Sequence, residues 1–172
     1  MRKPMVGRLT PLPPGDEGVK QTLRRMSEIA REYSKHPTII RLARAIVHSC
    51  PVKDFACEAK ALFEWVRDNI RWTRDVYGVE TLATPVRTLE MKAGDCDDLS
   101  TLLASLYLAV GFPVRYVVIA NLPQHPESFS HVFVQVDITG EGDWVSADPS
   151  QPNASFGWET PVQYRRMVWP VV

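Results

Sequence analysis

Three residues, Cys96, His131 and Asp148, are of the types that nucleophilic attack on an amide carbonyl requires. Cys96 lies in the segment 93–98 (Ala-Gly-Asp-Cys-Asp-Asp), directly before an apolar run with helical spacing. A thiol at a helix start is a candidate nucleophile, because backbone N–H groups and the helix dipole favour the thiolate and could bind an anionic intermediate. The three aspartates around Cys96 act in the opposite direction, since nearby carboxylates raise a thiol pKa unless they are committed to caps, loops or a basic partner.

A predicted β-hairpin carries the other two residues. Residues 131–138 alternate between apolar and polar positions, with valine repeated on one face. Residues 139–142 (Thr-Gly-Glu-Gly) supply a turn, and residues 144–148 return as the partner strand.

The register of this hairpin predicts a second feature of the site. Closing the loop with Ile138 opposite Asp143 gathers the apolar side chains on one face. It also places His131 and Asp148 together on the other face, near enough for the carboxylate to orient the imidazole. The predicted cross-strand pairs are Val134 with Ala147 and Val136 with Val145. We therefore expect Cys96 to attack a carbonyl, His131 to hold or take the thiol proton, and Asp148 to fix the tautomer.

Each of these residues also has a simpler structural interpretation. A lone cysteine before an apolar helix is more often a buried small residue than a nucleophile. Asp95 and Asp98 have the spacing of a helix-capping pair. Cys50, Cys57 and His48 match no common zinc-ligand spacing, so we expect the two cysteines to pack in the core as reduced thiols.

The remaining elements predict an α+β fold of one domain. Apolar stripes indicate helices from Asp16 to Tyr33, after a cap at Thr38, and from about Asp54 to Ile70, and a short helix near 86–91 precedes the cysteine helix at 96–110. Residues 114–120 read as a buried strand. We divide the chain into a Pro-rich arm (1–15), a catalytic domain (16–150) and a tail (151–172) that packs on the domain.

Composition narrows the class of protein. Twenty basic and twenty acidic residues cancel among 172, which argues against a nucleic-acid partner. The sequence has no apolar run of signal-peptide or membrane-spanning length, so we expect no membrane association. Three cysteines, expected to be reduced, favour the cytoplasm.

Five segments in order resemble the transglutaminase-like superfamily, which has a papain-like fold. They are Trp65–Ile70 (WVRDNI), 93–100 (AGDCDDLS), 111–117 (GFPVRYV), 131–134 (HVFV) and 144–149 (WVSADP). The resemblance implies N-terminal helices and a nucleophile-bearing helix packed on an antiparallel sheet. It also implies that Cys96, His131 and Asp148 are the nucleophile, base and orienting acid. The chain resembles the small single-domain members of bacteria and phages more than the large calcium-dependent cross-linkers.

The resemblance implies a cysteine-dependent hydrolase of amide or peptide bonds that acts through a thioester on a peptide or protein substrate. Two alternatives stay open: transglutaminase-type chemistry, with acyl transfer to an amine in cross-linking or to water in deamidation, and a non-catalytic binding or assembly module. Trp72 and Trp144 are further candidates to line the cleft or to complete the oxyanion site. We expect no cofactor and no metal, and the oligomeric state stays open.

Overall fold

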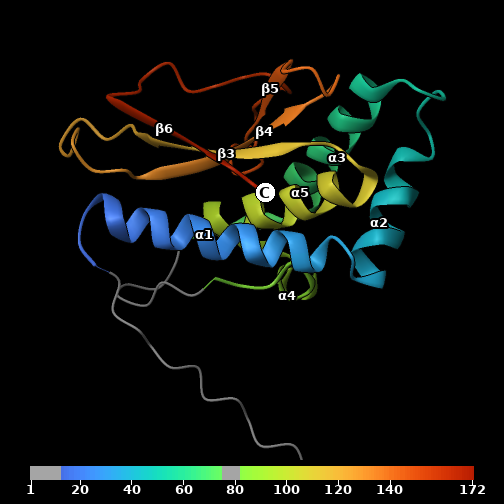
Figure 1. The fold of residues 1–172 in the computed structure, drawn as a ribbon, viewed down its shortest axis with the longest axis horizontal. Helices are drawn as coiled ribbons and strands as arrows, with labels where there is room; N and C mark the ends of the chain where they lie inside the picture. Colours follow the sequence, from blue (N-terminus) through green and yellow to red (C-terminus); the bar gives the residue numbers. More distant parts are fainter. Residues whose placement is uncertain (1–12, 75–81) are drawn as a thin grey trace, which may run out of the picture.

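The computed structural model describes residues 13–74 and 82–172, which form a layer of helices packed on an antiparallel sheet (Figure 1). This arrangement confirms the predicted α+β class. Within these two ranges, no helix is both long and apolar enough to cross a membrane. The elements are α1 (Asp16–Tyr33), α2 (Pro37–Val47), α3 (Phe55–Asn69), β1 (Arg71–Trp72), α4 (Pro85–Met91), β2 (Ala93–Gly94), α5 (Cys96–Val110), β3 (Val114–Ala120), β4 (His131–Asp137), β5 (Trp144–Ala147) and β6 (Arg165–Pro170).

The helices form where the apolar periodicity predicts them, with one correction at a cap. The stripe of α1 is confirmed by the burial of Leu23, Met26 and Ala30. The cap of α2 is His36 and not Thr38: its Nδ1 accepts the Thr38 N–H at 3.2 Å. Pro37 supplies the first helical residue, where a missing N–H costs nothing.

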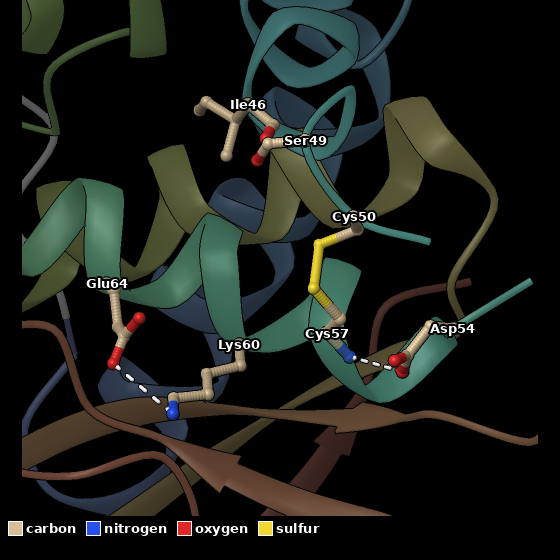
Figure 2. Close-up of a disulfide and its surroundings, with 7 residues drawn as sticks. All are labelled: Ile46, Ser49, Cys50, Asp54, Cys57, Lys60 and Glu64. Carbon is tan, nitrogen blue, oxygen red and sulfur yellow. Dashed lines mark hydrogen bonds and ion pairs between the residues drawn. A yellow bond between two sulfur atoms is a disulfide. The ribbon is translucent and has the colours of Figure 1, made fainter. Parts of the chain in front are cut away.

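A disulfide joins the segment that follows α2 to the first turn of α3 (Figure 2). Cys50 and Cys57 are both partly buried and are bonded to each other, so our expectation of two reduced core thiols is wrong. The Asp54 cap makes the bond possible, because its Oδ1 accepts the Cys57 N–H at 3.0 Å and starts α3 a few residues after Cys50. The two cysteines are bonded because each lies within bonding distance of the other, which the expectation of separate core thiols did not consider.

Helix α5 lies at the centre of the molecule. It packs against α1, α2, α3 and α4 and against strands β3 and β4 (Figure 1). The predicted apolar positions Leu99, Leu102, Leu103 and Leu106 are fully buried, whereas Val110 is only half-buried. Serine and threonine positions on the other sides of the helix are buried too, so α5 is enclosed all round and not amphipathic.

The main sheet has the order β5-β4-β3-β6, and all its pairs are antiparallel. Val134 lies opposite Ala147 and Val136 opposite Val145, which confirms the predicted register. The loop closes as expected, with the Ile138 N–H donating to the Asp143 carbonyl at 3.2 Å. The valine face of β4 contributes to the main core against α5.

Strand β6 was not anticipated in the sequence. Residues 165–170 pair with β3 along its length, so the C-terminal tail supplies one edge of the sheet. The Arg165 guanidinium also binds the Asp16 carboxylate at 2.7 and 3.0 Å, which ties this strand to the start of α1. Removing the tail would therefore remove part of the sheet as well as any cover it gives to the site.

The disulfide gives the first testable prediction. The Cys50→Ser/Cys57→Ser double variant should lose about 2 kcal/mol of unfolding free energy, because the cross-link no longer restricts the unfolded chain. Urea unfolding followed by circular dichroism measures the change.

A reductant supplies the matched control. It should lower the urea midpoint of the wild type to that of the variant and leave the variant unchanged. Alkylation of the unfolded, unreduced wild type should modify one thiol, that of Cys96. Modification of three thiols, or a urea midpoint of the wild type that does not change on adding the reductant, would contradict the presence of the disulfide.

Candidate functional site

The start of α5 is fixed by two aspartates and a glycine. The Asp98 N–H donates to Asp95 Oδ1 at 3.0 Å, and the Asp95 N–H donates to Asp98 Oδ2 at 3.5 Å. This reciprocal capping box confirms the predicted pair. Asp98 Oδ1 also accepts the Ala83 N–H at 2.8 Å. A Cβ on Gly94 would lie 2.7 Å from the Asp98 Cβ, so only glycine fits against this cap.

Cys96 is the first residue of α5, and its thiol is partly buried. Burial raises the pKa of the Cys96 thiol well above its usual range, and the carboxylates of Asp97 and Asp95 raise it further. The Val132 backbone N–H at the sulfur opposes this shift without cancelling it. Of the two opposing effects that the sequence indicates, the neighbouring carboxylates thus act in the expected direction, and the pKa of the thiol is raised despite its place at a helix start. Cys96 rests as a thiol, 3.6 Å from Asp97 Oδ1.

His131 and Asp148 form the pair that the hairpin register predicts. His131 Nε2 and Asp148 Oδ2 are 2.7 Å apart, and both side chains are nearly inaccessible to solvent. The other carboxylate oxygen, Oδ1, accepts the Ser150 hydroxyl at 2.7 Å and the Ser150 N–H at 3.1 Å. Both oxygens of Asp148 are thus engaged. Since Nε2 faces Asp148, Nδ1 is the ring nitrogen left for a reacting group.

Contacts with Val132 place Cys96 next to the strand that carries His131. Val132 directly follows His131 in β4, and its N–H faces the Cys96 sulfur. One turn into α5, the buried Ser100 hydroxyl donates to the Val132 carbonyl at 3.3 Å. Helix α5, which begins with the candidate nucleophile, is therefore bonded to the strand residue next to the candidate base.

The two tryptophans have different places. Trp72 pairs with Gly94, two residues before Cys96, and 45% of it is exposed. It lines a hollow of about 370 Å³ together with Pro149 and Ser150, which directly follow Asp148. Trp144 starts β5 at the end remote from Asp148, where the Arg115 guanidinium lies 4.1 Å over its ring. The structure brings Trp72, but not Trp144, beside the other candidates.

Sequence reasoning missed the roles of two residues near the site. Ser150, in Asp148-Pro149-Ser150, had a usable signal, because a serine two residues after an aspartate commonly closes a turn onto it. Arg67 had none, since its contact with the Ala154 carbonyl at 2.8 Å spans 87 positions. In residues 13–74 and 82–172, no three His, Cys, Asp or Glu side chains are grouped to hold a metal ion.

Comparison with known protein families covers the part of the chain that carries the candidate residues. Residues 40–149 match the Transglutaminase-like superfamily, which is more than half of the chain and includes all three candidate residues. The chain belongs to this superfamily. No curated protein gives a significant match.

Solved structures share the fold at low sequence identity. LapG of Legionella pneumophila has a TM-score of 0.55 and 15% identity, covering 86% of this chain and 81% of LapG. A proposed cysteine protease of Cytophaga hutchinsonii has a TM-score of 0.53 and 19% identity, covering 78% of this chain and 43% of that one. A proposed protease of Parabacteroides distasonis has a TM-score of 0.56 and 13% identity, with coverages of 90% and 36%. The chain thus spans less than half of the last two proteins.

The raised thiol pKa gives the second prediction. Replacing Asp97 by Asn removes one of the charges that disfavour the thiolate, so Cys96 should be alkylated by iodoacetamide several-fold faster at pH 7. In both proteins the rate should rise with pH up to the thiol pKa, and the variant should reach its plateau at lower pH. Intact-mass spectrometry measures the rate.

Asp143→Asn is the control, because Asp143 lies in the distant hairpin loop. It should leave the Cys96 rate unchanged. An Asp97→Asn rate equal to that of the wild type across the pH range would show that the Asp97 charge does not control the thiol.

Proposed function

We propose that this protein is a cysteine-dependent hydrolase of amide or peptide bonds, with Cys96, His131 and Asp148 as its catalytic residues. The observation that carries the proposal is the His131–Asp148 contact of 2.7 Å, on the strand whose next residue contacts the Cys96 sulfur. Superfamily membership supports the general class, a cysteine protease or transglutaminase-like enzyme.

The proposed reaction has two halves. In the first, the Cys96 sulfur bonds to the carbonyl carbon while His131 takes the thiol proton at Nδ1. The C–N bond then breaks, the amine leaves with the proton from His131, and a thioester remains. In the second, His131 takes a proton from water, the hydroxide displaces the sulfur, and the acid product leaves as the thiol is restored.

The raised pKa of the Cys96 thiol gives His131 its role. A thiol that does not ionise at neutral pH needs a base during the attack itself, and imidazole is suited to this at neutral pH. Asp148 holds the imidazole in one tautomer and stabilises its charge as the proton arrives. The Cys96 N–H, at the first position of α5, is the proposed first oxyanion donor.

Two alternatives remain. A primary amine in place of water would make the protein an acyltransferase that forms cross-links, on the same residues. A binding or assembly module would use the fold without the chemistry. The resting thiol, shielded by burial and flanked by carboxylates, is the observation that favours this second alternative.

The cytoplasmic location stays a proposal that the disulfide opposes. We based it on reduced cysteines, whereas Cys50 and Cys57 are bonded in the structure. Disulfides persist mainly in oxidising compartments.

The third prediction tests the catalytic residues. Cys96→Ala should abolish activity, His131→Ala should reduce it by at least about a hundredfold, and Asp148→Ala should leave a measurable remainder, because Asp148 orients the base without taking a proton. A synthetic glutamine-containing peptide, offered with and without a primary amine, gives products that mass spectrometry distinguishes.

Hydrolysed product alone supports the hydrolase, and an amine adduct supports the acyltransferase. Far-ultraviolet circular dichroism of each variant confirms that it is folded. If no product forms, and the Cys96→Ala and wild-type proteins bind the peptide equally, the binding-module alternative is favoured.

The fourth prediction concerns the hollow beside Asp148, which we propose takes a substrate residue next to the scissile bond. Trp72→Ala should raise KM several-fold with little change in kcat, because it removes one wall. Trp72→Phe keeps an aromatic ring at this wall but has no indole N–H, and it should behave like the wild type.

Trp158→Phe, in the C-terminal tail, serves as the control. A fall in kcat for Trp72→Phe, with KM unchanged, would overturn the wall assignment. It would identify Trp72 as an oxyanion donor instead.

A further inference from the structure

The turn that follows β5 holds the Asp148 carboxylate from its far side. Asp148 Oδ2 faces His131, while Oδ1 accepts the Ser150 hydroxyl at 2.7 Å and the Ser150 N–H at 3.1 Å. Asp148 and Ser150 are 3% and 4% exposed, so water has little access to replace either bond. A carboxylate with both oxygens bound in this way has one orientation about its side-chain torsions.

The other end of the same turn is held by Arg67 of α3. Its Nη1 donates to the Ala154 carbonyl at 2.8 Å. The adjacent Asp68 carboxylate binds the Arg67 Nε and Nη2 at 2.7 and 3.0 Å, which fixes the plane of the guanidinium. The guanidinium also lies 5.2 Å over the Phe63 ring. The turn 148–154 is thus held at two points: Ser150 bonds Asp148 near its start, and Ala154 bonds Arg67 at its end.

We propose that Ser150 and Arg67 are positioning residues that hold the Asp148 carboxylate on His131. Ser150 acts directly on the carboxylate, and Arg67 acts through the turn. The inference rests on the proposed function, because it assumes that His131 takes the Cys96 proton. It adds a reason for the arginine in the segment Trp65–Ile70, which binds the turn at Ala154 and also lines the hollow beside Asp148.

The chemical consequence is specific to proton transfer. When Ser150 loses its hydroxyl, one oxygen of a buried carboxylate keeps only a backbone N–H, and the carboxylate can rotate away from the imidazole. The base then loses the partner that stabilises its charge as it takes the thiol proton. A reaction in which the thiolate is already formed does not need that step.

The fifth prediction uses p-nitrophenyl acetate as the probe. The Cys96 sulfur bonds to the acetyl carbon, p-nitrophenolate leaves, and its absorbance reports the acylation rate. At pH 7, Ser150→Ala should acylate about tenfold more slowly than the wild type, since it loses a hydrogen bond to a charged group. Arg67→Met keeps the apolar stem over Phe63 and should be slowed about threefold.

The pH dependence separates positioning from general loss of structure. At strongly alkaline pH the thiolate forms without help from His131, so both variants should react at the wild-type rate there. Ser27→Ala is the matched control for Ser150: Ser27 is also 4% exposed, and its hydroxyl donates to the Leu23 carbonyl in α1. Arg25→Met, which breaks an exposed ion pair, is the control for Arg67.

The outcomes distinguish this inference from the proposed function. If His131→Ala acylates as fast as the wild type at pH 7, the proposed function fails. If His131→Ala is slow while Ser150→Ala matches the wild type, only the positioning role is overturned. Equal losses for Ser150→Ala at neutral and alkaline pH would show that the serine is merely structural and would also overturn the inference.

Discussion

The enclosure of α5 on every side is the constraint on which the rest of the structure depends. Four helices and three strands contact it among the described residues, and close-packed contacts of this kind leave little freedom to shift or rotate. Because Cys96 is its first residue, the packing of the whole helix sets the place of one sulfur atom. The capping box fixes the N-terminal end of α5, and the Ser100 bond to Val132 ties that end to β4, the strand that begins with His131. The buried leucines of α5 therefore help to set the position of the Cys96 sulfur.

This enclosure has an electrostatic consequence. The cap requires carboxylates at Asp95 and Asp98, and Asp97 follows the thiol directly, so the start of the helix is strongly acidic. Carboxylates at a helix start stabilise it, because they interact favourably with its free backbone N–H groups. Together with burial, however, they raise the pKa of the Cys96 thiol. The stability of the helix and the ionisation of Cys96 are therefore opposed. The proposed reaction at Cys96 therefore needs a base that acts when substrate is present, and His131, held by Asp148, is the residue proposed for it.

Local patterns made much of this predictable, and long-range contacts account for what they missed. The hairpin register followed from alternation and turn composition, so the meeting of His131 and Asp148 could be foreseen. The effect of the neighbouring carboxylates on the Cys96 thiol could also be foreseen, but the larger cause of its raised pKa, burial, could not, because it comes from elements distant in the sequence. The Cys50–Cys57 bond was missed because a helical stripe does not show where the chain turns between two helices. Strand β6 was missed because it is held by pairing with β3, which lies far earlier in the sequence.

The structural unit extends beyond the family match, which ends at Pro149. The Glu159 carboxylate bonds the Gln135 and Ser146 side chains of β4 and β5 and also the Arg166 guanidinium of β6. Burial alone would raise the pKa of Glu159, yet the hydrogen bonds from Arg166, Ser146 and Gln163 lower it to about 2, so the carboxylate stays charged at neutral pH. One carboxylate therefore connects three of the four strands. Since β4 and β5 carry His131 and lead to Asp148, the residues after the matched region help to hold the strands that form the site.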